Sequence, residues 1–403
     1  MPENILLFFS DTGRGHRSAT EAVEDALQLV AQSDFPGRVL NLIKEPVAEK
    51  SHPVNRAFVE FYNYLLQNHQ HLMKYYYDLL HVLRPHETEA GYQLSRQYLM
   101  KQLTEYKPSV VVSMHPMTNH YIARAMKEVG IAGDVKLVVV VTDPNKNLWR
   151  AWACPEADVI IAPNELVKEK LLEWNIQESK IKLSGMPVGP EFLSPPSVRR
   201  DEFLRPLGLS PDLPTLCINS GWAGGGNMLA AYRSLKNLDV RIQVLFLCGH
   251  NRSLYEKAKR EARNSNIPTA VLPFHDRMPD LMNAVDAMVT KAGGLTTYEC
   301  IARKLPMIVD VITAPMPQEA GTVEILVEQG LATRLQRSEQ LPSLVANLRH
   351  VPDRLDQPLP SKYCLDRTHA VFEIARTILE NTKGEKTRLE RASTLPSAQH
   401  TID

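Results

Sequence analysis

Short apolar runs alternate with stretches of helical spacing along most of the chain. We predict strands at residues 5–9, 39–43, 110–114, 136–142 and 158–162 in the first half, and at 215–219, 242–248, 269–273, 286–290 and 307–311 in the second. Apolar residues recur every three or four positions between them, which predicts helices after residue 16 and near 228–237, 253–263, 294–303 and 320–329. This alternation predicts an α/β fold built on parallel sheets.

A proline-bearing stretch separates the two halves. Seven prolines fall between residues 187 and 214, and composition of this kind is typical of a connection between domains. We predict five regions from this division: an N-terminal domain at 1–190, a linker at 191–213, a C-terminal domain at 214–364, a last helix at 365–382 and a disordered tail at 383–403.

Residues 54–83 interrupt the alternation. Aromatic and apolar residues crowd more than one face of this segment at helical spacing, and it carries few charges. One interpretation is a helical excursion packed on the N-terminal domain, because apolar helical stripes are usually core. The other is a surface for a bilayer or an apolar acceptor. On periodicity alone the packed helix is favoured.

Charge and cysteine content argue against a nucleic-acid-binding protein and against a disulfide-bonded one. Lysine plus arginine and aspartate plus glutamate both number 46, so nothing in the totals indicates nucleic-acid binding. The five cysteines contain no CxxC pair, which favours free thiols in a reducing compartment. No apolar run approaches the roughly 20 residues of a membrane span. We therefore expect a cytosolic protein, which can still lie on a membrane surface.

Each half contains a strand that runs into a glycine-rich turn and then a helix. The first turn carries Gly13, Arg14 and Gly15, and the second carries Gly224 and Gly225. Glycine lets the backbone approach a ligand, and the following helix N-terminus favours negative charge. Two such turns, in two α/β halves that face one another, predict an enzyme that uses a phosphorylated donor.

A third glycine turn, in the C-terminal half, predicts the donor site. Gly293 and Gly294 follow the strand at 286–290 and would offer amides to a diphosphate, with the Thr296 hydroxyl beside them. Glu299 lies one turn into the helix, where a carboxylate can accept hydrogen bonds from ribose hydroxyls. The structural alternative is a tight turn followed by a solvated glutamate.

Gln318 and Glu319 predict the sugar-binding part of the same site. They follow the strand at 307–311, and open α/β sheets bind ligands at the carboxyl ends of their strands. Adjacent amide and carboxylate groups can bind several sugar hydroxyls. The alternative is an acidic first turn that only stabilises its own helix.

Three side chains of the N-terminal half are candidates for proton transfer. His16 begins a helix after the first glycine turn and is our preferred general base; Asp143 ends an apolar strand and is either a second base or a partner of His16. His115 ends another strand, and a structural role is favoured for it. The chain has no DxD triplet and no GxxxxGK[ST] motif, so we expect neither a metal cofactor nor ATP hydrolysis.

Collinear motifs between residues 5 and 335 resemble one family. They are Ser10–Arg17, Ser113–Pro116, Val141–Asp143, Ser184–Val188, Cys248–Asn251, Thr290–Thr296 with Glu299, and Gln318–Glu319. This pattern is similar to that of the monogalactosyldiacylglycerol synthase and processive diacylglycerol glucosyltransferase family, relatives of the lipid II-forming N-acetylglucosaminyltransferase. The resemblance implies a GT-B fold, in which two Rossmann-like domains face across a cleft.

The resemblance also implies an activity and its partners. It implies inverting, metal-independent transfer of a hexose from a UDP-sugar to a lipid hydroxyl, with diacylglycerol as the expected acceptor. The enzyme would work on an anionic membrane surface, attached peripherally to the inner face of the membrane from the cytoplasm. The segment 54–83 stands where the family faces the membrane, so a bilayer or lipid surface now becomes the favoured interpretation of it.

Residue roles follow from the matched motifs. Glu299 would bind the ribose, the turn at 293–296 the diphosphate, and Phe274 would border the uracil. The implied donor-side residues are Gly224, Gly225, Asn251, Phe274, Gly293, Gly294, Leu295, Thr296, Glu299, Gln318 and Glu319. His16 and Asp143 would be catalytic. The implied acceptor-side residues are Gly13, Arg14, Gly15, His115, Tyr62 and Tyr76.

Departures from the family pattern keep alternatives open. Arg14 stands in place of a third glycine, His250 in place of an arginine, Thr322 in place of an asparagine, and Met316 with Pro317 in place of Pro-Gly. The identity of the sugar stays open among galactose, glucose, N-acetylglucosamine and glucuronate. The alternative functions are a lipid II-type transferase, a UDP-sugar 2-epimerase and a non-catalytic UDP-sugar sensor.

Overall fold

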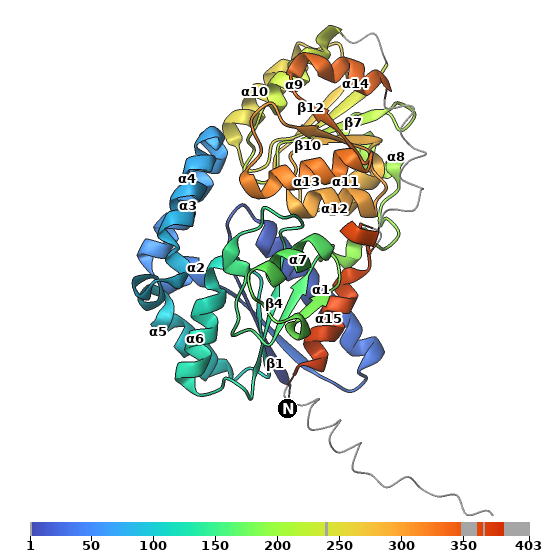
Figure 1. Ribbon diagram of the computed structural model, residues 1–403. Coiled ribbons are helices and arrows are strands. Elements are labelled where there is room, and N and C mark those ends of the chain that lie inside the picture. Colours follow the sequence, from blue (N-terminus) through green and yellow to red (C-terminus); the bar gives the residue numbers. More distant parts are fainter. Residues whose placement is uncertain (1, 238–240, 348–360, 366, 383–403) are drawn as a thin grey trace, which may run out of the picture.

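The computed structural model describes residues 2–237, 241–347, 361–365 and 367–382, so the tail predicted at 383–403 lies outside the described residues. Within them the chain forms two parallel six-stranded sheets, one in each half, and the two halves stack one above the other (Figure 1). All strand pairs within the two sheets are parallel. The two halves therefore repeat one architecture.

The N-terminal sheet has the order β2-β1-β3-β4-β5-β6. Its strands are β1 (Glu3–Phe9), β2 (Leu40–Pro46), β3 (Val110–Ser113), β4 (Lys136–Val140), β5 (Val159–Ala162) and β6 (Ile181–Leu183). Both faces are covered, as parallel sheets require. Leu7 faces a core shared with α1 (Gly15–Asp34), while Leu6 faces a core shared with α5 (Glu89–Tyr106) and α6 (Asn119–Val129).

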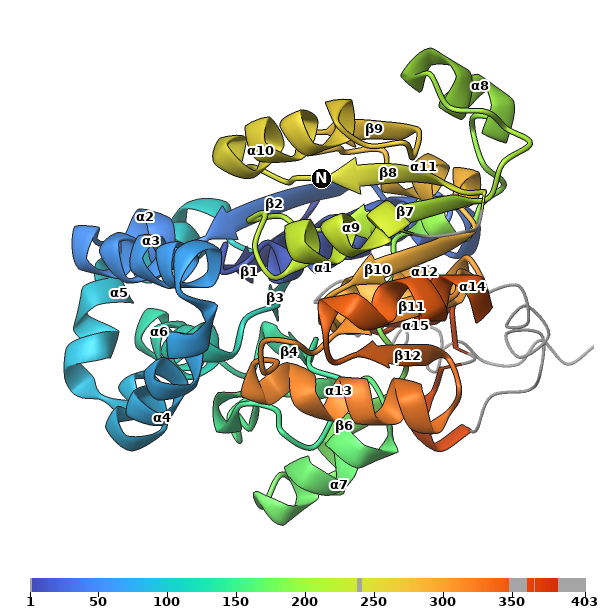
Figure 2. The same ribbon diagram turned by 90° about the horizontal axis from the view of Figure 1, so that it is seen from above.

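The C-terminal sheet has the order β12-β11-β10-β7-β8-β9, which Figure 2 shows from above. Its strands are β7 (Thr215–Asn219), β8 (Gln243–Leu247), β9 (Thr269–Leu272), β10 (Ala287–Thr290), β11 (Met307–Asp310) and β12 (Ala332–Leu335). On one face pack α9 (Met228–Ser234), α10 (Arg252–Arg263) and α14 (Leu341–Asn347). On the other pack α11 (Met278–Ala284), α12 (Gly294–Ala302) and α13 (Pro317–Glu328).

The last helix returns to the N-terminal domain. Helix α15 (Ala370–Glu380) packs along α1, and its buried face belongs to the same apolar core. Arg38 donates to the carbonyl of Leu379 at 3.2 Å, and Arg376 pairs with Asp34. The chain therefore crosses between the domains twice, once after Val188 and once before Ala370.

Four helices from residues 47 to 106 depart from the regular alternation. They are α2 (Val47–Ser51), α3 (Pro53–Asn68), α4 (Met73–Leu83) and α5. Helices α3 and α4 rise along the side of the molecule toward the C-terminal domain (Figure 1). One face of this pair is buried, with Tyr62, Leu65 and Tyr77 in the core, while another stays open to solvent. The packed-helix interpretation thus holds for the buried face, and the bilayer or acceptor surface stays a prediction for the exposed face.

The ten predicted strands are present, with ends shifted by up to a few residues. Prediction missed β6 and β12, because both are short and carry charged side chains that break the apolar run. Helix α13 begins at Pro317 rather than at 320, so Gln318 and Glu319 lie in its first turn. Helix α15 begins at Ala370 rather than at 365.

Candidate active site

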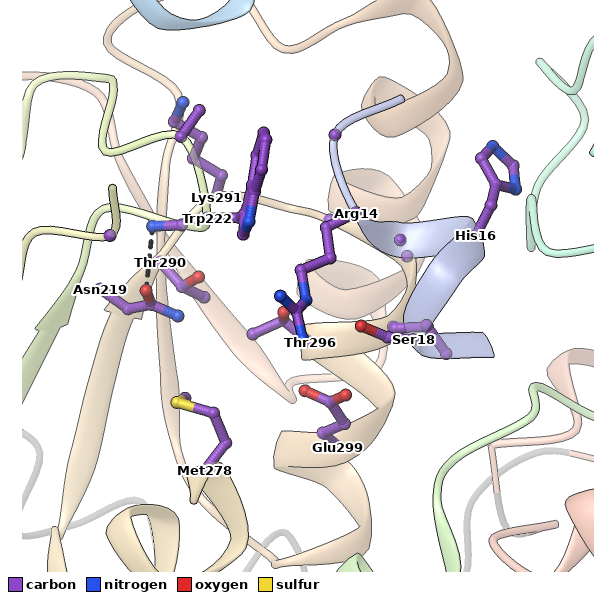
Figure 3. Close-up of a pocket in the computed structure, with 18 of the residues that line it drawn as sticks. Arg14, His16, Ser18, Asn219, Trp222, Met278, Thr290, Lys291, Thr296 and Glu299 are labelled. Atoms are coloured by element: carbon purple, nitrogen blue, oxygen red, sulfur yellow. Dashed lines mark hydrogen bonds between the residues drawn. The ribbon is translucent and has the colours of Figure 1, made fainter. Parts of the chain in front are cut away.

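A cavity of about 380 Å³ lies between the two domains, with walls from both. The N-terminal domain contributes the turn around Arg14 and the strand end at Asp143. The C-terminal domain contributes the ends of β7 and β10 and the first turns of α12 and α13 (Figure 3). The cavity therefore lies at the carboxyl edges of both sheets, where the glycine turns were predicted to face one another.

His16, in the first turn of α1, is held beside the end of β4. Its Nδ1 lies 3.1 Å from the Thr142 hydroxyl oxygen, and its ring centroid lies 4.5 Å from that of His115. Enclosure by protein lowers the pKa of His16 to about 4, against a smaller opposing effect of a hydrogen bond to the Met114 backbone. The imidazole is therefore neutral at pH 7, the state in which it can accept a proton.

His115 supports His16 from the end of β3. Its Nε2 lies 3.1 Å from the Thr12 hydroxyl oxygen, which ties the first glycine turn to β3. Burial lowers the pKa of His115 well below its ordinary value, and the neighbouring His16 lowers it further. His115 is therefore also neutral, and it contacts the base rather than the main cavity.

Asp143 is bonded to Trp152 and not to His16. The indole Nε1 of Trp152 donates to the Asp143 carboxylate at 2.6 Å. Burial raises the pKa of Asp143 to about 6, although the hydrogen bonds from Trp152 and the Trp149 backbone lower it. The side chain that shares a hydrogen bond with His16 is Thr142, so Thr142 and not Asp143 orients the imidazole.

A second cavity of about 110 Å³ adjoins His16 and Asp143. Its wall comes from α3, α4, the loops after β3 and β4 and the first turn of α13, and it includes the rings of Tyr62, Tyr76 and Trp149. The His81 ring stacks on Trp149 with centroids 4.9 Å apart. Burial raises the pKa of Tyr76 to about 12, so its hydroxyl remains a donor at neutral pH. This pocket offers an apolar approach to the base.

Arg14 occupies a backbone conformation that favours glycine. Its φ is 66° at the N-cap of α1, which projects the side chain into the main cavity. The guanidinium carbon lies 4.8 Å from the centroid of the Phe274 ring, across the cleft. A nitrogen of the same group lies 3.9 Å from Glu21. The departure from the family glycine thus places a cation against the C-terminal domain.

Phe274 lies in a row of rings on the nucleotide side of the cavity. His250 stacks on it with centroids 4.5 Å apart and planes 14° apart, and Trp222 meets His250 at 5.3 Å. His250, the second departure, therefore packs beside the predicted uracil position.

Helix α12 presents its N-terminus and Glu299 to the cavity. Gly293 is the N-cap and Gly294 the first residue of the helix, and a side chain on Gly294 would come within 3.1 Å of the Thr142 carbonyl oxygen. Enclosure raises the pKa of Glu299 to about 8, and the nearby Glu191 contributes to the rise. A carboxyl group that lies in a cleft with so high a pKa is typical of a ligand-binding position.

The glycine turn after β7 lies next to the wall that the C-terminal domain gives to the main cavity. Gly224 has a φ of 69°, and a side chain there would lie 2.1 Å from the Cys248 carbonyl oxygen. The Asn251 side chain donates to the Gly224 carbonyl at 2.8 Å. Gly224, Gly225 and Asn251 therefore shape this turn from outside the main cavity, whereas their neighbours Ala223 and Gly249 line it.

Lys291, which is not among the predicted site residues, lies under that turn. A side chain on Gly225 would come within 3.2 Å of its Nζ atom. Burial lowers the pKa of Lys291, while the charges of Glu319 and Asp310 oppose that change. Its position one residue after β10, at the carboxyl edge of the sheet, was the signal that would have identified it.

Gln318 and Glu319 close the cavity from the first turn of α13. The Gln318 amide donates to the Tyr77 hydroxyl, and the Asn145 amide donates to the Gln318 carbonyl at 2.6 Å. Burial raises the pKa of Glu319 and Lys291 lowers it. Thr322, the third departure, accepts from Asn145 at 2.9 Å, so it joins the domains and does not face the cavity.

All predicted site residues other than Gly224, Gly225 and Asn251 line one of the two cavities. The main cavity is lined by Gly13, Arg14, Gly15, His16, Tyr62, Asp143, Phe274, Gly293, Gly294, Leu295, Thr296, Glu299, Gln318 and Glu319. His115 and Tyr76 line the smaller one. Catalytic, donor-side and acceptor-side candidates thus meet at one place.

Two family models match the chain, one in each domain. Residues 16–188 match monogalactosyldiacylglycerol (MGDG) synthase, and residues 227–362 match the glycosyltransferase family 28 C-terminal domain. The N-terminal domain of this chain is thus similar to monogalactosyldiacylglycerol synthases, and its C-terminal domain to glycosyltransferases of family 28. The family resemblance of the chain is thereby confirmed, and the protein is a glycosyltransferase.

Named relatives agree with this assignment. A probable chloroplastic monogalactosyldiacylglycerol synthase of Glycine max is 29% identical over 94% of this chain and 71% of its own length. Monogalactosyldiacylglycerol synthase 1 of Arabidopsis thaliana is 28% identical over the same shares.

Solved structures confirm the GT-B fold of this chain. Acinetobacter baumannii MurG superposes with a TM-score of 0.56 at 15% identity, covering 94% of this chain and 100% of its own. Neisseria meningitidis UDP-GlcNAc 2-epimerase gives a TM-score of 0.60 at 11% identity over the same shares. In the part of the chain that the structure describes, none of the helices combines the length and the apolar character that crossing a membrane needs.

Proposed function

We propose that this protein transfers a hexose from a UDP-sugar to the free hydroxyl of diacylglycerol, with inversion at the anomeric carbon. The observation that carries the proposal is the single cavity in which His16 and Asp143 face Glu299, Gln318 and Glu319. The relatives named monogalactosyldiacylglycerol synthases supply the acceptor and the reaction type.

The proton of the acceptor hydroxyl goes to His16 in this reaction. The acceptor oxygen forms a bond to the anomeric carbon on one face, the bond to the UDP oxygen breaks on the other, and the hydroxyl proton passes to the imidazole. The low pKa of His16 and its hydrogen bond with Thr142 support this role, because they give a neutral, oriented base. Attack opposite the leaving group inverts the sugar.

The leaving diphosphate is met by protein groups and not by a metal ion. The N-terminus of α12 at Gly293 and Gly294 offers amides and the positive end of the helix dipole. Lys291 and Arg14 supply positive charge from opposite sides of the cleft. Glu299 accepts from the ribose hydroxyls, and Gln318 with Glu319 bind the hexose.

The acceptor comes from a membrane surface, to which the enzyme binds peripherally from the cytoplasmic side. Nine of the twelve exposed large hydrophobic residues in the described chain lie between residues 54 and 83, including Phe58, Tyr75 and Val82. Arg56 and Lys74 are exposed on the same helices, as are Glu60 and Asp78, so the exposed apolar side chains carry the argument for a bilayer contact. The aromatic pocket next to His16 links this surface to the base.

The decisive experiment offers the protein diacylglycerol in anionic vesicles with UDP-galactose, UDP-glucose, UDP-N-acetylglucosamine or UDP-glucuronate. Mass spectrometry of the extracted lipid should show one hexose on diacylglycerol with one donor, and NMR should show a β-linkage from the α-linked donor. The rate should not depend on added Mg²⁺ or Mn²⁺. UDP binding without any glycolipid would refute the proposed acceptor.

The membrane contact has a separate test. Replacing Phe58, Tyr75 and Val82 together with serine should lower co-flotation with anionic vesicles and leave UDP affinity unchanged. Serine at Val39 and Leu172, which are also exposed but lie elsewhere, is the matched control. Equal flotation of both variants would exclude α3 and α4 as the contact.

A further inference from the structure

His120, Cys154 and Glu156 bring three metal-binding atoms together in the N-terminal domain. One nitrogen, one sulfur and one carboxylate oxygen lie within 4.8 Å of one another. The Glu156 oxygen is 3.6 Å from Cys154 Sγ and 3.8 Å from His120 Nδ1. Tetrahedral bonds of about 2.0–2.3 Å place such ligands roughly 3.3–3.6 Å apart. The three atoms therefore need little movement to share one ion.

His86 adds a fourth group and an independent observation. Its side chain is 2% exposed, and neither ring nitrogen has a hydrogen-bond partner among the described residues; Nε2 lies 3.4 Å from a Glu87 oxygen. Its ring centroid is 5.5 Å from that of His120. Two imidazoles on one tetrahedral metal have centroids roughly 5 Å apart. Buried polar atoms without partners are rare, and a shared ion would give Nδ1 of His86 a partner while Nε2 keeps its contact with Glu87.

We propose that His86, His120, Cys154 and Glu156 form a binding site for a divalent transition metal ion, with Zn²⁺ as the expected ion. The ligand set selects the ion, because thiolate and imidazole favour Zn²⁺ while Mg²⁺ and Ca²⁺ prefer oxygen ligands alone. On binding, the sulfur–metal bond replaces the sulfur–hydrogen bond, and the thiol proton passes to solvent.

The neighbouring contacts indicate what such an ion would do. His86 comes from the turn after α4, His120 from the first turn of α6, and Cys154 from the loop before β5. Cys154 follows Trp152 by two residues, and Trp152 donates to Asp143. The ion would fasten three segments behind the Asp143 side of the cleft. It is separate from the donor diphosphate, and the inference does not depend on the proposed reaction.

Cobalt titration of the full-length protein, freed of metal by a chelator and kept reduced with a phosphine, tests the site. Wild type should bind one equivalent of Co²⁺ with a thiolate-to-cobalt charge-transfer band, and Zn²⁺ should displace it. Cys154→Ala should abolish the band. Cys217→Ala, at another buried cysteine on β7, is the matched control and should keep it.

Two further variants separate loss of metal binding from loss of folding. Glu156 is exposed, so Glu156→Gln should fold normally and weaken Co²⁺ binding at least about tenfold, as should His86→Ala. Zn²⁺ should raise the Tm of wild type and Cys217→Ala but not of Cys154→Ala. A wild type without the charge-transfer band, or a band that survives in Cys154→Ala, would overturn the proposal whether or not glycolipid is made.

Discussion

The N-terminal and C-terminal sides of the cleft hold their titratable groups in different ways. His16, His115 and Asp143 each have a side-chain partner within the N-terminal domain, at distances of 3.1, 3.1 and 2.6 Å. On the C-terminal side, Lys291 and Glu319 each favour the charged form of the other, and Glu299 lines the cavity. The side chains on the N-terminal side thus have their hydrogen-bond partners before any ligand binds. On the C-terminal side we expect a ligand to supply part of the contacts.

Replacing the base should give the largest effect and should fall on one side of the comparison alone. We expect His16→Ala to lower kcat about 10²- to 10⁴-fold, the usual contribution of a general base. The UDP dissociation constant should change less than about twofold, because the C-terminal side is untouched. Initial rates and calorimetry measure the two quantities.

His369→Ala serves as control, since His369 is exposed at the N-cap of α15. A His16→Ala enzyme with near-normal kcat would show that another group accepts the proton, and Asp143 would then be the next candidate.

The converse change on the donor side should separate binding from turnover. Glu299→Ala should raise the UDP dissociation constant roughly 10- to 100-fold, because hydrogen bonds to a charged group contribute about 1.5–3 kcal/mol. At saturating donor, kcat should fall much less. Glu324→Ala, on the exposed face of α13, is the matched control. An unchanged UDP affinity would remove Glu299 from the ribose site.

The pH dependence of donor binding tests the same carboxyl group in the unaltered enzyme. With a pKa of about 8, Glu299 is mostly protonated at pH 7 in the free protein, and ionisation improves it as an acceptor for two hydroxyls. UDP affinity should therefore rise between pH 6 and 9 by roughly tenfold per unit below the pKa. The stability gained from keeping this group protonated is fully present below its ordinary pKa of 4.5 and is lost as the pH rises to about 8.

Glu299→Gln cannot ionise, so its UDP affinity should be nearly flat across that range. A wild-type profile that is equally flat would contradict the raised pKa.

Arg14 crosses between the two sides, and its replacement should give the smallest effect. Arg14→Gly relieves a left-handed residue, worth roughly 1–2 kcal/mol, and loses a contact with Phe274 worth about 0.5–1 kcal/mol. The Tm should therefore change little, while the KM for the donor should rise a few-fold. Arg14→Lys keeps the charge and should recover part of the affinity. A large fall in kcat would instead place Arg14 in the transition state.

Local patterns in the sequence predicted most of the fold and the cavity. The glycine turns and the polar residues just after them could be read directly, because a strand, a turn and a helix N-terminus are close in sequence. Residues such as His16, Glu299 and Gln318 therefore appeared where expected.

Features that depend on distant segments escaped prediction. The return of α15 onto α1 joins residues more than 300 positions apart, so neither helix alone indicates it. The sequence offered Asp143 as a possible partner of His16, but the partner is Thr142. The two residues are adjacent at the end of the same strand, and only the direction of the side chain distinguishes them. The cluster around Cys154 also comes from three separate segments, and none of them carries a metal-binding spacing.

The double crossing between the domains constrains both mechanics and dissection. Two connections join the domains, one after Val188 and one before Ala370, and α15 packs along α1 in the N-terminal domain. Two connections restrict the relative movement of the domains more than one would. The double crossing also means that the N-terminal domain is discontinuous: a fragment cut at residue 190 would leave the apolar stripe of α1 bare, whereas adding back residues 370–382 should restore its cover.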